Sequence, residues 1–308
     1  MHLSNALPLF CSVSLFSATA TAGQWEINND LKYTDGAHSD ITTYDNVGDF
    51  DKRKIKQKRK TTLDTLLTYT VETTLPELAY VARVGHLFKR TKDRDLQLKD
   101  DGSLKKDKTR TEFERITYAG LGLRYDTGRA IGADRWLLKA RYDRYLHVSY
   151  GANQLHEDAK ARSGDLNGYE WSLKASGEYS TRWPEIYLHP FIEYKQERLS
   201  AWHDDARDKS KEAEMEQQYE AGLLLSWLTP VDGWELIAGS FWQRELDAER
   251  ATDEKDWIWD DDERWIAQVK FEYEAPLPGF EMEFVVKQHL NGGDKGERRY
   301  NLELSYEF

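Results

Sequence analysis

Charged side chains in this 308-residue sequence follow a two-residue spacing that could build two walls of opposite charge. One group is basic and falls in three consecutive segments, while the other is acidic and falls in four segments nearer the C-terminus. Charges that face each other across an enclosed space would orient polar molecules and weaken the passage of apolar ones. The basic group is Arg83, Arg124, Arg135, Lys139 and Arg141, and the acidic group is Glu216, Glu220, Glu235, Glu245, Glu281, Glu283 and Glu303.

Aromatic and small residues share the parity of these charges. The small residues would leave space between the walls, and the aromatic rings could offer stacking surfaces to sugars. The alternative is that the rings pack against their neighbours and that the charges pair with each other and fill the interior. The aromatic residues are Tyr118, Tyr145, Tyr187, Phe191 and Phe241, and the small residues include Gly85, Gly120, Gly122, Gly222 and Gly239.

The elements that must position these side chains are β-strands. In the last segment Tyr300, Leu302 and Leu304 alternate with Asn301 and Glu303, and alternation of this kind is the period of a strand. Twelve segments follow the rule. They are approximately 24–34, 60–72, 78–90, 110–125, 135–147, 167–179, 186–198, 214–228, 234–246, 264–273, 280–287 and 299–308.

The connections between the segments alternate between short and long. Short links such as 229–233 and 274–279 carry Pro and Gly, whereas long polar links lie at 35–59, 91–109, 148–166, 199–213, 247–263 and 290–298. Aromatic residues cluster at the ends of the apolar faces, as two interfacial girdles would require. These features favour an all-β fold, a transmembrane antiparallel up-and-down β-barrel of 12 strands, over a soluble sandwich. Pro190, inside a strand, is expected near a bulge or a rim.

Composition excludes several other classes. A chain with 13% aromatic residues is not disordered, and a net charge of −12 argues against nucleic acid as a partner. The single cysteine, Cys11, rules out a disulfide framework. After residue 22 no stretch has the ~18 apolar residues of a spanning helix.

The N-terminal residues resemble an export signal. Residues 3–22 lack charge and end in Ala20-Thr21-Ala22, which predicts a signal peptide over 1–22 and a barrel over 23–308. The mature chain is therefore expected to be exported and to contain no disulfide.

The ending Tyr306-Glu307-Phe308, with the alternation and the export signal, resembles Gram-negative outer-membrane proteins. In that class Tyr306 and Phe308 would be the assembly signal read by the barrel assembly machinery. The chain is similar to the monomeric porins, which are porin G and the oligogalacturonate-specific (KdgM-like) and sialic-acid porins. The stretch 257–264 is similar to the end of porin G, which would imply 14 strands, whereas the twelve segments match the acidic-sugar porins.

The expectation is therefore a monomeric porin without a cofactor, a passive diffusion channel for small hydrophilic solutes, with oligosaccharides as the expected cargo. Two alternatives stay open, an outer-membrane enzyme and a plugged structural or adhesin barrel. No Gly-x-Ser-x-Gly motif or local Ser–His pairing supports an enzyme, and His203-Asp204-Asp205 is the nearest approach to a rim protease.

Three further groups have weaker indications. Seven bases between Lys52 and Lys60 could touch lipopolysaccharide phosphates, which with outer-membrane lipids are the expected membrane partners. The run Asp260–Glu263 could hold Ca²⁺, although an exposed acidic run is the simpler interpretation. The eight histidines show no metal-ligand spacing, so no metal is expected.

Overall fold

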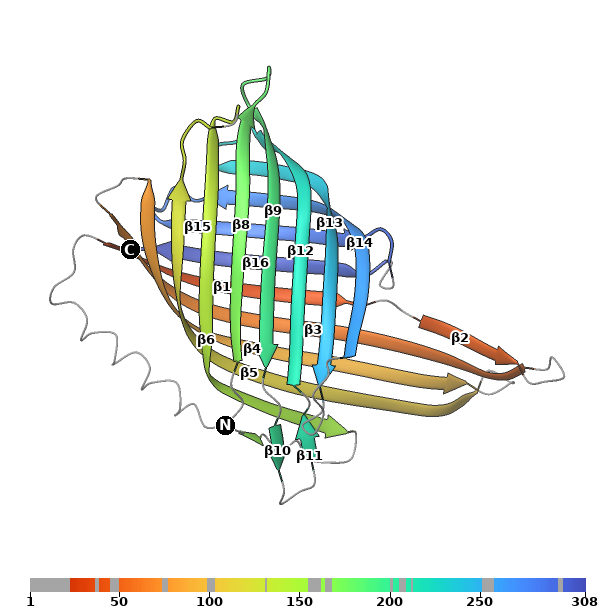
Figure 1. Ribbon diagram of the computed structural model, residues 1–308. Coiled ribbons are helices and arrows are strands. Elements are labelled where there is room, and N and C mark those ends of the chain that lie inside the picture. The colour runs from red at the N-terminus through yellow and green to blue at the C-terminus, as the bar shows by residue number, and fades with distance from the viewer. Residues whose placement is uncertain are drawn as a thin grey trace.

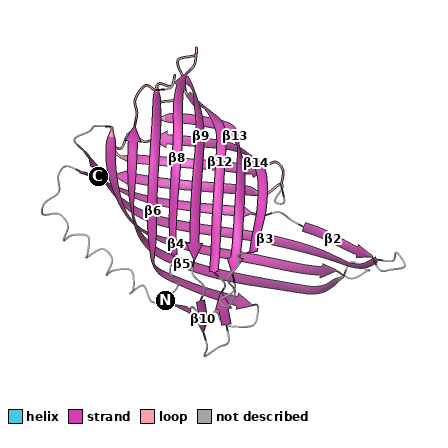
Figure 2. Ribbon diagram, viewed as in Figure 1, coloured by secondary structure: helices cyan, strands magenta, loops and turns pink. Residues whose placement is uncertain are grey.

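The computed structural model describes the chain as strands joined by turns, and the described residues contain no helix (Figure 2). The described residues are 23–36, 39–44, 50–73, 77–98, 103–130, 132–154, 162–163, 168–199, 202–204, 209–211, 213–250, 258–292 and 296–308. The expected signal peptide at 1–22 lies outside them.

Twelve long strands form the wall of a closed barrel (Figure 1). They are β1 (Gly23–Asp35), β3 (Phe50–Glu72), β4 (Leu78–Leu98), β5 (Leu104–Asp126), β6 (Arg135–Gln154), β8 (Gly168–Ser180), β9 (Ile186–Leu199), β12 (Ala213–Leu228), β13 (Trp234–Arg250), β14 (Ile258–Glu274), β15 (Phe280–His289) and β16 (Arg298–Glu307). The four short strands are β2 (Ser39–Tyr44), β7 (Arg162–Ser163), β10 (Trp202–Asp204) and β11 (Lys209–Lys211).

The barrel closes through β1. This strand pairs antiparallel with β16 on one side and with β3 on the other, so that neither edge of the sheet is left unpaired. At the seam the Phe308 amide donates to the Trp25 carbonyl over 2.8 Å. In addition to the ring, the 14-stranded sheet contains β2, which pairs antiparallel with the start of β3, and β7, which pairs with β6. The predicted count of 12 barrel strands is confirmed, and the alternative of 14 is wrong.

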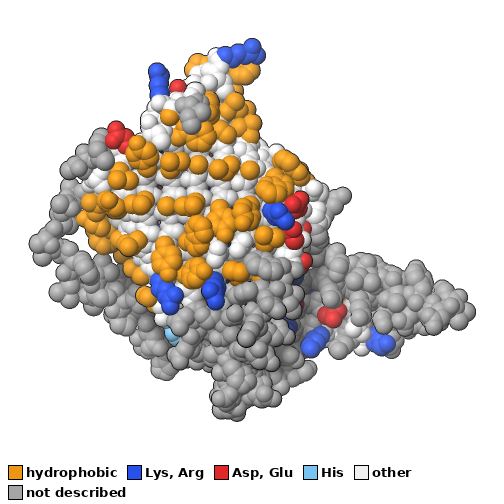
Figure 3. All heavy atoms as spheres, in the orientation of Figure 1, with side chains coloured by type: hydrophobic (Ala, Val, Ile, Leu, Met, Phe, Trp, Pro, Cys, Tyr) orange, Lys and Arg blue, Asp and Glu red, His pale blue; other side chains and the backbone are white. Residues whose placement is uncertain are grey.

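Apolar side chains cover the outer face of the barrel. Leu121 and Ile192 are 69% and 62% exposed, which is tolerable for such residues only against lipid or a partner. Figure 3 shows this surface as rows of hydrophobic side chains across the strands in view. Aromatic pairs mark its borders: Tyr194 and Tyr219 lie 4.8 Å apart at the end toward the long loops, and Trp234 and Tyr273 lie 4.7 Å apart at the end toward the short turns.

Several strands are longer than predicted. The segments predicted as 60–72 and 110–125 are Phe50–Glu72 and Leu104–Asp126, and β13 and β14 reduce the predicted loop 247–263 to residues 251–257. The prediction ended each strand where apolar residues ceased. A backbone ladder needs only antiparallel partners, so the polar ends of neighbouring strands stay paired beyond the apolar belt.

Two local features involve proline and glycine. Pro190 lies in β9 at an unbroken register with Leu223 of β12, while its pairing with β8 is interrupted, because proline has no amide to donate. The expected bulge or rim position is therefore wrong.

Among the short turns, Gly233 and Gly279 have φ of 76° and 79°, a conformation that favours glycine.

No described helix has the length and apolar character needed to cross a membrane.

Candidate functional site: the barrel lumen

The order of strands around the ring sets the two predicted walls against each other. Five strands lie between β5 and β14 in either direction around the ring, and β4 and β6 lie opposite β13 and β15 in the same way. The basic group comes from β4, β5 and β6, and the acidic group from β12, β13, β15 and β16. Parity along each strand directs both groups inward, opposite to the apolar outer face.

The basic wall is partly neutralised by carboxylates that the sequence analysis did not select. Arg83 and Arg141 each lie 3.1 Å from Oδ2 of Asp143, and Arg141 also pairs with Glu170 of β8. Asp143 is 4% exposed, so its charge depends on these two guanidiniums. Glu170 also accepts from Lys195 over 3.0 Å, and the network joins β4, β6, β8 and β9, spanning β5 on the way.

Three other bases lie toward the short turns. Arg124 and Lys139 are register partners on β5 and β6, and within the described chain no ion pair engages either one. Arg135 lies 2.5 Å from Asp126, at the mouth of the barrel. The basic wall is therefore strongest at this end, where Arg124 and Lys139 keep their charge available to a solute.

The acidic wall surrounds a cavity at the same end. The cavity has a volume of about 460 Å³ and is lined by Glu235, Glu272, Glu281, Glu283 and Glu303 together with the turn 229–233. Lys270 lies 2.9 Å from Glu283 and also contacts Glu272. Glu274 and Asp232 also line this cavity, so one lysine faces seven lining carboxylates and this side of the mouth carries net negative charge.

A second cavity, of about 330 Å³, lies at the end toward the long loops and is lined by both signs of charge. Lys89 of β4 reaches Glu114 over 3.5 Å and Glu197 of β9 over 3.6 Å. Lys60 and Glu216 also line this space. The two cavities occupy opposite ends of the lumen.

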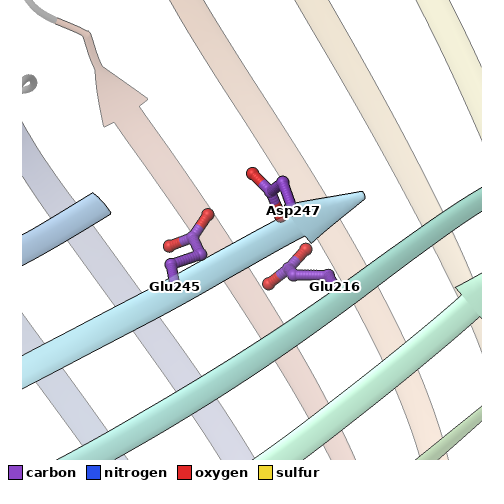
Figure 4. A group of neighbouring side chains, drawn as sticks. All are labelled: Glu216, Glu245 and Asp247. Atoms are coloured by element: carbon purple, nitrogen blue, oxygen red, sulfur yellow. The ribbon is translucent and has the colours of Figure 1, made fainter. Parts of the chain in front are cut away.

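Three carboxylates converge beside the second cavity. Side-chain oxygens of Glu216, Glu245 and Asp247 lie within 4.8 Å of one another, and Figure 4 shows them projecting from β12 and β13. Carboxylate oxygens are ligands for hard divalent cations. Glu245 is already engaged by Arg264, which is 2% exposed and lies 3.2 Å from Asp262. The guanidinium of Arg264 therefore already neutralises part of the charge of this group, at Glu245.

The predicted sugar-stacking aromatics lie among other lumen side chains. The Tyr118 hydroxyl donates to both Asp64 oxygens over 3.0 Å, and that of Tyr145 donates to Glu197 over 2.6 Å. Phe191 and Phe241 pack edge to face at 5.7 Å. Lys174 and Lys287 lie 5.4 and 5.2 Å from these rings. Contact with a sugar stays a prediction, and it applies best to the half-buried Phe191 and Tyr187.

The lumen glycines do not leave the space that was expected. A Cβ on Gly120 would overlap the Asp143 carboxylate and lie 2.5 Å from the Tyr142 carbonyl oxygen. Gly85 is covered in the same way by the Tyr118 ring, and Gly222 and Gly239 by Phe241 and Leu224. These glycines allow larger side chains to lie across a neighbouring strand. The space they provide is used for packing and for ion pairs.

Acidic and basic residues outside the walls also have defined places. The Asp260–Glu263 run lies on β14, so its members alternate between faces: Asp261 accepts two hydrogen bonds from Arg244, of 3.0 and 2.7 Å, while Asp262 faces Arg264 inside. The Lys52–Lys60 run lies on β3, and the side chains of residues 52–57 lie outside the described ones. For His203 and Asp204 only the pairing of β10 with β11 is described, and Asp205 falls outside.

One serine–histidine contact escaped the sequence analysis. His189 Nε2 lies 2.8 Å from Ser226 Oγ, although the residues are on β9 and β12. Ser226 has no exposed surface, so its hydroxyl offers no approach for a substrate. The contact is a hydrogen bond between neighbouring strands that no local motif encodes.

Comparison with known proteins identifies the fold. No family model and no curated protein matches the sequence. Among solved structures, the β-domain of the Bordetella autotransporter BrkA is similar with a TM-score of 0.55 at 12% identity, over 94% of this chain and 100% of that one. The transport unit of the autotransporter AIDA-I from Escherichia coli gives 0.56 at 11%, over 96% and 94%. An outer membrane channel from Pseudomonas putida F1 gives 0.53 at 13%, over 94% and 97%.

The chain has the fold of an outer-membrane β-barrel, shared by autotransporter translocators and channels. None of these three structures is an oligogalacturonate-specific porin, so the predicted membership of that family stays a prediction.

Proposed function

We propose that the chain is an outer-membrane channel through which small hydrophilic solutes diffuse down their concentration gradient, with the long loops outside the cell. The main support for this proposal is that the bases of β4–β6 lie across the lumen from the carboxylates of β13–β15. The lumen also has a cavity at each end. Charged, hydrated walls lower the barrier for a polar solute and raise it for an apolar one.

Oligosaccharides are the proposed cargo. Arg124 and Lys139 would attract a carboxylate-bearing sugar at the short-turn mouth, and Phe191 would offer a ring face deeper in the lumen. Because seven lining carboxylates lie on the opposite side, the mouth would orient such a solute and not simply concentrate it.

A plugged structural barrel is the second candidate, and one observation favours it. Ile116, Tyr118, Tyr145, Val148 and Leu199 form a buried cluster on the inner face, with Leu66 and Leu87 packed against it. Side chains fill the interior of narrow barrels, and twelve strands fall between the filled eight-stranded and the open sixteen-stranded barrels.

Swelling of proteoliposomes separates the two candidates. Vesicles containing the folded protein are diluted into isotonic arabinose, a neutral tetrasaccharide or trigalacturonate, and light scattering follows solute entry. A channel gives fast swelling with arabinose and slower swelling with larger solutes. A rate equal to that of protein-free vesicles for every solute would show a plugged barrel.

Two further proposals follow from the family resemblance. Phe308 pairs with Trp25 at the barrel seam, where Tyr306 and Phe308 would present the assembly signal to the barrel assembly machinery.

We also propose that the protein is a monomer. Light scattering of the detergent-solubilised barrel, corrected for bound detergent, measures its mass directly.

A further inference from the structure

The outer face of the β4–β5 pair carries a basic and aromatic patch, here called the outer patch, made of Phe88, Arg90, Phe113 and Arg115. Phe88 lies opposite Arg115 in the register, and Arg90 lies opposite Phe113. The two rings stack at 6.1 Å. Each guanidinium lies 5.8 Å from the centre of the ring on the other strand, Arg90 over Phe113 and Arg115 over Phe88.

These side chains face away from the lumen. Their neighbours Leu87, Lys89 and Glu114 point inward, where Leu87 packs on the buried cluster and Lys89 pairs with Glu114. Alternation along a strand then directs Phe88, Arg90 and Arg115 outward, and both arginines are exposed.

The outer patch begins where the apolar belt ends. Val84 and Leu121, which are 46% and 69% exposed, are the belt residues below it. Phe88 is the register partner of Leu63, an exposed belt residue of β3. On β6, Arg144 follows Tyr142 by two residues, and Tyr142 stacks on Tyr169 in the girdle at the long-loop end. The bases therefore lie at the depth of lipid headgroups.

The arginines of the outer patch have no carboxylate partner among the described residues. In the part of the chain that the structure describes, Arg90, Arg115 and Arg144 form no ion pair. On the opposite side of the barrel, Arg244 lies two residues beyond Trp242, but it binds Asp261 bidentately and lies 3.6 Å from Glu263. The arginines of β4–β6 thus differ from Arg244 in having no carboxylate partner among the described residues.

We infer that the outer patch binds the phosphate groups of lipopolysaccharide, the phosphorylated lipid of the leaflet on the long-loop side. Guanidinium groups bind phosphate oxygens through paired hydrogen bonds, and aromatic faces hold each guanidinium in place. The patch continues directly into the apolar belt, so a ligand with both a phosphate and acyl chains fits it better than a free anion does. This inference rests on the proposed membrane orientation.

The test uses the folded barrel in neutral detergent micelles, with bisphosphorylated lipid A as the probe and native mass spectrometry to measure bound lipid. The patch variant is Arg90→Gln with Arg115→Gln. The control variant is Arg244→Gln with Arg298→Gln, which removes the same charge from outward-facing positions elsewhere on the barrel. Both must keep the heat-resistant mobility of the folded protein.

We expect the patch variant to bind lipid A at least about tenfold more weakly than the wild type, because it loses two charge-assisted contacts. The control should stay close to the wild type, and lipid A without phosphates should bind weakly to all three proteins. Equal affinity of the patch variant and wild type would overturn the inference, as would an equal loss in the control or strong binding of the phosphate-free lipid.

Swelling assays on the same preparations keep the two proposals separate. Selective lipid A binding without solute uptake would support the outer patch and contradict the channel. Solute uptake with unselective lipid binding would contradict the outer patch alone.

Discussion

The hydroxyl of Tyr145 on β6 donates a 2.6 Å hydrogen bond to Glu197 on β9, passing over β8, the strand between them. Gly168 makes this possible, because a Cβ there would lie 2.5 Å from Cδ2 of Tyr145. Lys89 of β4 lies 3.6 Å from the same carboxylate, Glu197. Glu197 thus connects β9 to β6 and to β4 through the lumen, although neither β6 nor β4 is a direct neighbour of β9 in the sheet.

Removing this hydroxyl should destabilise the barrel. We expect Tyr145→Phe to lower the free energy of unfolding in lipid vesicles by about 1 to 3 kcal/mol, because a buried hydrogen bond to a charged group is lost. Tyr142→Phe, which changes an outward-facing tyrosine of the same strand, should change it by less than about 0.5 kcal/mol. Urea titration of both variants measures the difference, and equal effects would mean that the lumen contact contributes nothing.

Two neighbouring glycines of β5 should respond differently to the same substitution. Gly120→Ala should cost about 1 to 3 kcal/mol and disturb the Arg83–Asp143–Arg141 network, because its Cβ would meet the Asp143 carboxylate and the Tyr142 carbonyl. At Gly122 the nearest atom is the Ala140 carbonyl oxygen at 3.2 Å, so Gly122→Ala should be close to neutral. Unfolding midpoints in urea provide the comparison. A larger loss at position 122 would be inconsistent with the packing described.

Ion selectivity should depend on the two bases that face the lumen without an ion pair in the described chain. We expect Arg124→Gln with Lys139→Gln to move the reversal potential in a salt gradient toward cation selectivity, because the acidic wall opposite them is unchanged. The control is Arg90→Gln with Arg115→Gln, which removes two charges from the outer face. Reversal potentials that shift equally in both variants would rule out a role for the lumen wall.

The hairpin of β4 and β5 beyond the apolar belt should have a measurable pH signature. Arg94 donates hydrogen bonds of 3.1 and 2.7 Å to Asp107 and holds the pKa of that carboxyl below its ordinary value of 3.8. A carboxyl with a lowered pKa in the folded state stabilises the fold above its unfolded pKa, and this contribution disappears as the pH falls through the folded pKa. Carbon-13 NMR titration should place the Asp107 midpoint below 3.8 in the wild type.

Arg94→Gln should return that midpoint toward 3.8, since the hydrogen-bond donor and its charge are removed. Arg90→Gln on the same strand should leave the Asp107 midpoint where it is. An Asp107 pKa that is insensitive to Arg94 would show that the pair does not persist in solution.

The sequence predicted the barrel because the two-residue alternation reports directly on a wall with lipid on one side. Phe271 and Lys270, adjacent on β14, take opposite faces for that reason. The same parity brought Arg83 and Glu283 to opposite walls, although it could not show that Asp143 neutralises Arg83 or that Lys270 reaches Glu283.

What the sequence could not show depends on register between strands. Glu170 also has inward parity, but its pairing with Arg141 requires β6 and β8 to be aligned, which the connecting loop does not reveal. The contact of Asp143 with Arg83 likewise requires β6 to be aligned with β4 across β5. The same holds for Ser226 and His189. Strand ends were missed because β3 and β5 continue into polar sequence, where the apolar signature that marks the lipid belt is absent.

Single-channel recording in a planar bilayer tests the central claim most directly. After insertion of the folded wild-type protein, a lumen that conducts predicts uniform current steps, and addition of trigalacturonate should reduce the current reversibly as the sugar enters. Insertion that is confirmed by protease protection but produces no current steps at any applied voltage would contradict the account.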